Sequence, residues 1–255
     1  MDIQTNTPTS HANDRFYQER CSLAAAFRLA HREGWTEAVA NHFSLSVSDD
    51  GSLFLINPAG LHFSQIKASD LLLCDANDPQ TTLARDNAPD PTAWSIHSAF
   101  HRNRPDARAC LHVHALNATV FACLQDTPLP PIDQNTARFF KRYAYDDGYK
   151  GMGFESEGER LSHTLGPHRI LVMGNHGVMA AADSVARAFD ELYYFERACA
   201  TFLKAAGSGC PLKVLDDDIA EKTAQEWEDY PGEGWNQHFE ALQGILDKLE
   251  PEYRQ

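Results

Sequence analysis

The sequence predicts an α/β or α+β sandwich in which helices cover a central sheet. Short apolar runs typical of strands are mixed with longer segments of helical spacing, without a strict alternation of strand and helix. A chain of 255 residues that is 43% hydrophobic can bury the core of one large domain. We therefore expect one domain over residues 16–255, preceded by a flexible polar segment at 1–15.

The first half of the chain is expected to supply two helices and three strands. Apolar side chains recur at helical spacing over Phe16–Arg32, and the turn-rich sequence SDDG separates two expected strands at Asn41–Val47 and Leu53–Ile56. A second helix over Thr92–Asn103 is expected to stop before Pro105, because proline disfavours helix in the residue before it. The run ARACLHVH then has the apolar density of a buried strand.

The second half is expected to alternate helices with one further strand. We expect a helix at Asn117–Leu124, a surface loop at the proline-rich TPLPPIDQN, and a strand at Arg169–Met173. Asp183 is the expected N-cap of a long helix reaching about Ala206. An acidic helical tail follows from about Leu215, and its segment HFEALQGILDKLEP has the apolar spacing of one more helix.

Charge and composition exclude several classes of protein. The formal net charge of −14 would repel nucleic acid and anionic lipid surfaces, and no stretch is apolar enough for a signal peptide or a membrane span. The six cysteines form no C-x-x-C pair and are interpreted as buried thiols in a reducing compartment. We therefore expect a cytoplasmic protein whose partner is a small molecule.

Three histidines form a candidate metal site. His112 and His114 alternate on an expected strand, so both imidazoles would face the same side within reach of one ion. His176 lies in a glycine-flanked turn at the end of another apolar run, from which a side chain can project into a cleft. Three imidazole ligands leave coordination positions open, which is typical of a catalytic rather than a structural site.

Several short motifs, taken in order, resemble those of the class II aldolase and adducin family. They match over roughly residues 18–206, and the tail from Trp235 to Tyr253 is similar to that of adducin-like members. The motifs are Gly34-Trp35-Thr36-Glu37, Asn41-His42-Phe43-Ser44, Asn57-Pro58-Ala59-Gly60, Arg104-Pro105-Asp106, His112-Val113-His114 and Asn175-His176-Gly177.

The resemblance implies a three-layer αβα sandwich around a mixed or antiparallel sheet of about nine strands. It also implies a homotetramer with active sites at subunit interfaces, and one divalent cation per subunit on His112, His114 and His176. Zn²⁺ is the expected cation, and Mn²⁺, Fe²⁺, Co²⁺ and Ni²⁺ are alternatives that imidazole also binds. Such a cation acts as an electron sink for an enediolate, which serves aldol cleavage, decarboxylation or epimerisation.

The chain departs from the sugar-phosphate aldolases at the acid/base position. Their P-S-x-E stretch corresponds to Asp90-Pro91-Thr92-Ala93, so Ala93 stands where the catalytic Glu would be. Alanine cannot transfer a proton. Glu37 is the preferred substitute base, Asp90 and His42 are alternatives, and each is equally well interpreted as a structural residue.

Other family positions suggest further site residues. The resemblance implies substrate contacts at His42, Asn57, Gly60 and His97, and a tyrosine proton donor at Tyr145, with Tyr149 nearby in the same expected loop. His42 and Ser46 replace an Asn and an Arg that are frequent in these enzymes, which disfavours a phosphorylated sugar.

His97 and His101 form an i, i+4 pair on the expected helix, a spacing that could also bind metal. We expect instead that His97 lines the cavity or packs, and that His101 is solvated.

The preferred function is a metal-dependent carbon–carbon lyase, of the aldolase or decarboxylase type, for a small non-phosphorylated hydroxy- or oxo-acid. The first alternative is a non-catalytic, adducin-like binding or assembly module, although adducin-type heads typically lack the three histidines that this chain retains. The second is a cupin-like oxygenase, which also uses H-x-H, yet HVHALNATV lacks the glutamate that usually follows there.

Overall fold

A seven-stranded mixed sheet forms the centre of the computed structural model, which describes residues 15–125, 128–151 and 157–255. Its strand order is β3-β2-β1-β4-β7-β6-β5, and all neighbours are antiparallel except β5 and β6. The strands are β1 (His42–Ser46), β2 (Leu53–Ile56), β3 (Leu72–Asp75), β4 (Ala109–Val113), β5 (Tyr143–Asp146), β6 (Ile170–Met173) and β7 (Gly177–Ala182).

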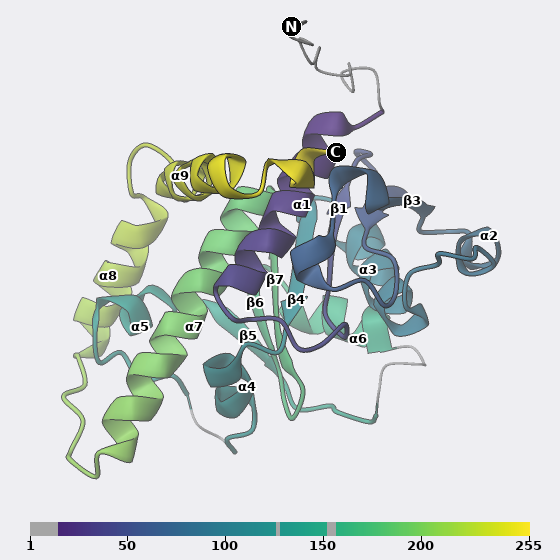
Figure 1. Cartoon of the computed structure of the whole chain (residues 1–255). Coiled ribbons are helices and arrows are strands. Elements are labelled where there is room, and N and C mark those ends of the chain that lie inside the picture. Colours follow the sequence, from purple (N-terminus) through teal and green to yellow (C-terminus); the bar gives the residue numbers. More distant parts are fainter. Residues whose placement is uncertain (1–14, 126–127, 152–156) are drawn as a thin grey trace, which may run out of the picture.

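Helices cover both faces of the sheet, so the expected αβα sandwich is confirmed (Figure 1). One face carries α1 (Tyr17–Arg32), α4 (Leu116–Ala122) and α7 (Val185–Gly207), and the other carries α3 (Pro91–Asn103) and α6 (Glu157–Leu165). The described residues contain seven strands rather than the nine that the resemblance implied. The remaining helices are α2 (Pro79–Leu83), α5 (Gln134–Arg138), α8 (Asp217–Glu228) and α9 (Gly234–Leu249).

Alternation along β1 divides its side chains between the two layers. Phe43 and Leu45 join the apolar core beneath α1 and α7, where Phe43 stacks on Phe27 with ring centroids 4.7 Å apart. Successive strand residues point to opposite faces, so His42 and Ser44 turn toward α3 instead. The sheet therefore has an apolar face under α1 and a partly polar seam under α3.

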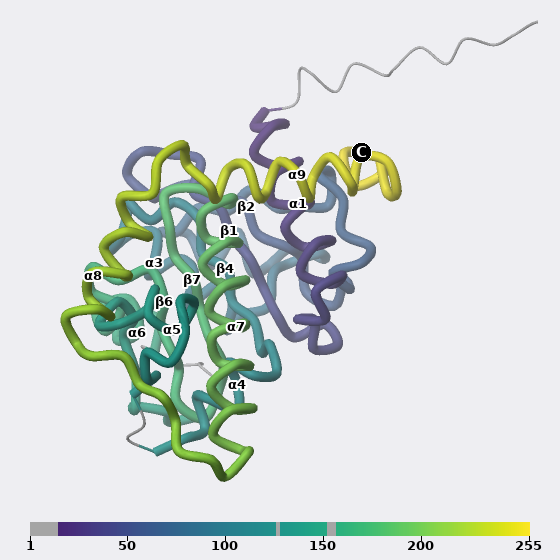
Figure 2. Tube along the Cα trace, turned by 90° about the vertical axis from the view of Figure 1, so that its left-hand side faces the viewer, coloured from purple at the N-terminus to yellow at the C-terminus, as the bar shows by residue number. Residues whose placement is uncertain are grey.

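The C-terminal residues close over α1. Helix α9 crosses the ends of α1 and α7, and Figure 2 shows the last residues beside α1. Tyr253 is fully buried there, and the backbone N–H of Ser69 donates to the carbonyl oxygen of Gln255 at 2.8 Å. Arg28 on α1 contacts Glu250 at 3.2 Å. The tail is thus part of the packed core rather than an appendage.

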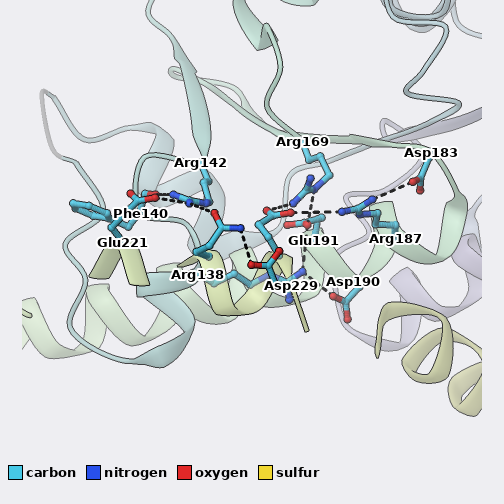
Figure 3. Close-up of polar contacts among 12 residues, drawn as sticks. Arg138, Phe140, Arg142, Arg169, Asp183, Arg187, Asp190, Glu191, Glu221 and Asp229 are labelled. Carbon is cyan, nitrogen blue, oxygen red and sulfur yellow. Dashed lines mark hydrogen bonds and ion pairs between the residues drawn. The ribbon is translucent and has the colours of Figure 1, made fainter. Parts of the chain in front are cut away.

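A network of ion pairs holds α5 and α8 against α7 (Figure 3). Arg138 lies between Asp190 at 2.8 Å and Glu191 at 3.3 Å, and both carboxylates are buried. Arg169 bonds Glu191 at 2.8 Å and also pairs with Glu228 on α8. Buried charges are tolerated only when they are paired, so this network ties α5, α7, α8 and the residue before β6 together.

Most expected elements are present, with bounds within a few residues of those predicted. Strands β3, β5 and β7 and helices α2, α5, α6 and α8 were not predicted. Part of the expected surface loop is therefore helical, because α5 begins at Gln134, and residue 127 of that loop lies outside the described residues. The expected flexible segment also falls almost wholly outside them, because residues 1–14 are not described.

Two detailed predictions were wrong. Ser184, and not Asp183, is the N-cap of α7, because its side chain accepts a hydrogen bond from the backbone N–H of Arg187. Cys123 and Cys210 are exposed, whereas the other four cysteines are buried as expected, and all six are free thiols. Among the described residues, no helix combines the length and apolar character needed to cross a lipid bilayer.

Replacing Arg138 with Met should destabilise the fold by up to about 3–5 kcal/mol, because the buried carboxylates of Asp190 and Glu191 would both lose the guanidinium that lies between them. Arg142→Met is the matched control, since Arg142 pairs with the half-exposed Glu221, and its loss should be below about 1 kcal/mol. Urea unfolding followed by tryptophan fluorescence measures both values. Equal losses in the two variants would contradict the role given to the buried network.

Candidate metal centre

Three chain segments meet at one end of the central strands β1, β4 and β7. The end of β4, the start of β1 and the turn between β6 and β7 come together there, because His42 pairs with His112 and Val113 pairs with Val178 in the strand registers. His176 lies in the turn itself, one residue before β7. The sheet thus brings His176 to His112 and His114, although it lies more than sixty residues later in the chain.

The three imidazoles form a compact cluster. Their ring centroids are 4.8 to 5.0 Å apart, and one ring nitrogen from each lies within 4.8 Å of the others. The Nε2 atoms of His112 and His114 are separated by 3.0 Å. His112 is buried, and the other two residues are partly buried.

Hydrogen bonds to the opposite ring nitrogens fix where the protons lie. Nδ1 of His112 is 3.1 Å from the carbonyl oxygen of Val178, which can only accept, so this nitrogen must carry the proton. Nδ1 of His114 meets the carboxylate of Glu37, which leads to the same assignment. When both rings are neutral, each Nε2 atom therefore carries a lone pair, and the two lone pairs face each other across 3.0 Å.

Two facing lone pairs fit a bound cation. The Nδ1 atom of His176 is also buried and has no hydrogen-bond partner among the described residues. Burial and, to a smaller extent, the nearby His114 lower the pKa of His176 to about 4, and burial holds the pKa of His112 well below its usual value. Neutral imidazoles with unpaired nitrogens are the form that binds metal ions.

A glycine permits the close approach of the histidines. A Cβ atom built on Gly177 would lie 2.7 Å from Cδ2 of His114 and 2.8 Å from the carbonyl oxygen of Val113. Contacts this short do not occur with real side chains, so only glycine fits at the first position of β7. Asn175 in the preceding turn has a φ of 59°, a left-handed conformation that asparagine tolerates better than most residues.

Glu37 is placed to orient His114. Its carboxylate accepts from Nδ1 of His114, and its own backbone N–H donates to Oδ1 of Asn41 at 3.0 Å. Carboxylates that bond the second nitrogen of a metal-binding imidazole fix its tautomer and orientation. The Glu37 side chain is nevertheless 60% exposed, so it is also open to a ligand entering from solvent.

A second group of polar side chains lies behind the cluster. His42 contacts His112 with ring centroids 4.8 Å apart, and its Nδ1 is 2.7 Å from Nε2 of His97. His97 and His101 both contact the hydroxyl of Ser44. The prediction that His101 is solvated was therefore wrong, because its exposure is 0%. Ser44 was not predicted to be a site residue, although its alternation with His42 on a strand was a usable signal.

Asn57 and Gly60 shape the adjoining loop. The Asn57 side chain accepts from the backbone N–H of Phe43 at 3.3 Å and donates to the carbonyl oxygens of Asn41 and Pro58. Gly60 has a φ of 76°, which favours glycine, and a Cβ there would meet nothing within 4 Å. Both positions thus have a backbone role, and their expected substrate contacts stay a prediction.

The position of the missing glutamate is filled by a buried methyl group. Ala93 packs in the first turn of α3, and Asp90 caps that helix by accepting from the N–H groups of Thr92 and Ala93. Burial raises the pKa of Asp90, but the bonds from Thr92 and Ala93 outweigh it and hold the pKa below its usual value. Asp90 is also close enough to His42 for their charges to interact.

The two candidate tyrosines differ in their surroundings. Tyr145 lies on the edge strand β5 rather than in a loop, and its hydroxyl donates to the carbonyl oxygen of Ala122 at 3.0 Å. Tyr149 follows that strand, and its ring lies 6.2 Å from the ring of His176. Within one chain, the ring of Tyr149 therefore lies beside the histidine cluster.

Comparison with known proteins agrees with the fold. The family model described as the class II aldolase and adducin N-terminal domain matches residues 21–203. A crystal structure of an aldolase II superfamily protein from Pseudomonas syringae is 32% identical, has a TM-score of 0.84, and covers 96% of this chain and 98% of its own.

Relatives with other names match as well. A Pseudomonas aeruginosa protein whose name provisionally assigns it to aldolase class 2 is 31% identical over 247 residues, which is 94% of this chain and 93% of that protein. Alpha-adducin of Rattus norvegicus is 30% identical over 90% of this chain, but the match spans only 33% of the adducin.

Gly177→Ala should weaken Zn²⁺ binding by about 10- to 100-fold, the range seen when groups that orient metal ligands are altered, because the new methyl displaces His114. Gly244→Ala is the control, since a Cβ there meets nothing within 4 Å. Competition with a chromogenic chelator measures both affinities. Unchanged affinity in Gly177→Ala would show that these histidines do not share an ion.

Proposed function

This chain belongs to the class II aldolase and adducin family, and we propose that it is a divalent-cation-dependent carbon–carbon lyase of the aldolase or decarboxylase type. The proposed substrate is a small hydroxy- or oxo-acid without phosphate. The observation that carries the proposal is the 3.0 Å approach of the Nε2 atoms of His112 and His114, whose Nδ1 atoms both bond oxygen acceptors. Two such nitrogens repel each other when both rings are neutral, and a cation held between them removes that repulsion.

His112, His114 and His176 are the proposed ligands of one cation per subunit, with Zn²⁺ preferred and Mn²⁺, Fe²⁺, Co²⁺ or Ni²⁺ as alternatives. When bound, the cation supplies Lewis acidity at the substrate oxygens and an open side for them. The chain itself supplies orientation, since Val178 and Glu37 hold two of the rings by their Nδ1–H groups.

Proton transfer in this proposal cannot use position 93, because alanine has no ionisable group. Glu37 is the proposed base, since its exposed carboxylate adjoins a proposed ligand. Tyr145 was the expected proton donor, but its hydroxyl already donates to a backbone carbonyl oxygen. The contact of Tyr149 with His176 favours Tyr149 as the donor within one chain.

We propose further that the protein is cytoplasmic and forms a homotetramer. The support for association of subunits is an exposed apolar strip on α4, where Leu116 is 72% and Val120 is 42% exposed. This strip lies near the candidate site, because the backbone N–H of Asn175 donates to Ala122 at the end of α4. Large exposed apolar side chains beside one another often mark protein contacts.

The second candidate function is a non-catalytic binding or assembly module like the adducins. The match to alpha-adducin over 90% of this chain and the alanine at position 93 favour it. A module of this kind needs no cation, so metal content separates the two candidates.

The purified protein should contain about one equivalent of divalent cation per chain, because three neutral imidazoles form the proposed site. His112→Ala with His114→Ala should remove it, whereas His163→Ala should not, since His163 bonds the Glu159 carbonyl oxygen of its own helix, away from the three histidines. Plasma mass spectrometry measures the content. A wild-type protein that takes up no stoichiometric metal would favour the adducin-like module.

Incubation of the metal-loaded protein with a panel of hydroxy- and oxo-acids should release pyruvate or carbon dioxide from at least one member. The double histidine variant should lose at least a hundredfold in rate, since it removes two of three proposed ligands. Coupled spectrophotometric assays measure the release. Equal rates in the wild type and the double variant would rule out the cation mechanism.

Glu37→Gln should weaken Zn²⁺ binding by about tenfold or more, because the carboxylate that orients His114 is lost. Glu33→Gln, an exposed change at the end of α1, is the control and should bind normally. Chelator competition again gives both affinities. A Glu37→Gln variant with normal affinity would leave Glu37 without the orienting role.

A further inference from the structure

A buried chain of polar groups runs behind the candidate metal centre, between β1 and α3. It consists of His42, His97, Ser44 and His101, and we call these four residues the imidazole chain. Nδ1 of His42 is 2.7 Å from Nε2 of His97, and Nδ1 of His97 is 2.5 Å from Oγ of Ser44. The same Oγ is 2.7 Å from Nε2 of His101.

Regular structure places these groups together. His42 and Ser44 alternate on β1 and face α3, while His97 and His101 are one helical turn apart on α3 and face β1. A strand and a helix usually meet through apolar side chains, and buried polar groups are retained only when they are hydrogen-bonded. All four residues are at most 6% exposed.

The hydroxyl of Ser44 makes all the hydrogen bonds of the imidazole chain run in one direction. A serine hydroxyl has one proton, so it can donate to one imidazole nitrogen and must accept from the other. Burial lowers the pKa of His101 to about 3 and holds the pKa of His97 well below its usual value, so both rings are neutral and each carries one proton. Only two arrangements of the protons satisfy every contact, and they run in opposite directions.

The surroundings of His101, at the far end of the imidazole chain, select one direction of donation. Nδ1 of His101 is buried and has no hydrogen-bond partner among the described residues, and the ring of Phe54 lies against His101 with centroids 5.0 Å apart. A buried N–H group without an acceptor is rarer in proteins than an unused acceptor. The proton of His101 therefore lies on Nε2, and it donates to Ser44.

The direction then propagates to the candidate site. Ser44 donates to Nδ1 of His97, and Nε2–H of His97 donates to Nδ1 of His42, which leaves the proton of His42 on its Nε2. We propose that Ser44, His97 and His101 fix His42 as an Nε2–H donor, and that this N–H donates to a substrate oxygen beside the cation. This inference rests on the proposed function.

The position of His42 suits that task. His42 pairs with His112 across the sheet, and their rings lie 4.8 Å apart, so His42 flanks a proposed ligand. A nitrogen that carries a proton cannot coordinate a cation, which leaves the open side to the substrate. Donors fixed beside an oxygen on which negative charge develops stabilise that charge without reorganising. Ser44, His97 and His101 are positioning residues in this scheme.

The decisive experiment is a long-range ¹H–¹⁵N spectrum of the imidazoles in ¹⁵N-histidine-labelled protein loaded with Zn²⁺. The spectrum distinguishes protonated from bare ring nitrogens. We expect His42 with its proton on Nε2, and a His42→Gln variant assigns its signals. A His42 with its proton on Nδ1, or on both nitrogens, would overturn the inference without the use of any other variant.

Ser44→Ala tests whether the Ser44 hydroxyl links His101 to His97 and so fixes the tautomer of His42. It should leave His42 as a mixture of tautomers and weaken the binding of glycolate, a hydroxy-acid probe with two adjacent oxygens, by about tenfold, as loss of one hydrogen bond to a charged group implies. Ser46→Ala is the matched control, because Ser46 lies on the same face of β1 but donates to the carbonyl oxygens of Ser48 and Leu53. It should change neither property.

The failures of the two proposals are distinguishable. If Ser44→Ala and Ser46→Ala give the same His42 spectrum and the same glycolate affinity while Zn²⁺ stays bound, the inference is wrong and the lyase proposal stands. If the wild type binds no Zn²⁺, the lyase proposal fails. The tautomer of His42 in that metal-free protein then still decides whether the imidazole chain has the direction assigned to it.

Discussion

The register between β4 and β7 is the constraint on which the candidate centre depends. Pairing of Val113 with Val178 sets the turn that carries His176 directly beside His112 and His114. A shift by one residue would turn His112 to the opposite face, toward α1 and α7. Gly177 keeps this register possible, since any larger residue would collide with His114.

The two faces of the sheet serve different purposes. Beneath α1 and α7 the packing is apolar and includes the stacked rings of Phe27 and Phe43. Beneath α3 the same strand β1 contributes His42 and Ser44 to a hydrogen-bonded seam. A neutral, mostly satisfied network of this kind costs little in stability and holds side chains in one arrangement. The larger apolar cluster thus lies on the face of α1 and α7, and the candidate chemistry lies on the opposite face.

The sequence predicted what depends on local periodicity. Alternation in the run ARACLHVH correctly put His112 and His114 on one side of a strand, and helical spacing located α1, α3 and α7 within a few residues. Contacts between distant segments were less accessible. The bond from Glu37 to His114 spans 77 residues and follows from no spacing rule. Strand β7, with the sequence GVMAAA, was overlooked because glycine and alanine are poor strand formers.

Closure of the tail over α1 has a consequence for synthesis on the ribosome. The salt bridge between Arg28 and Glu250 joins residues 222 positions apart. Synthesis proceeds at about 5–20 residues per second, so the outer side of α1 stays uncovered for roughly 10–45 s until the residues that cover it have been made. During that interval the helix exposes surface that could recruit a chaperone or a second nascent chain. The outer side of α1 therefore acquires its cover only after more than 200 further residues have been made.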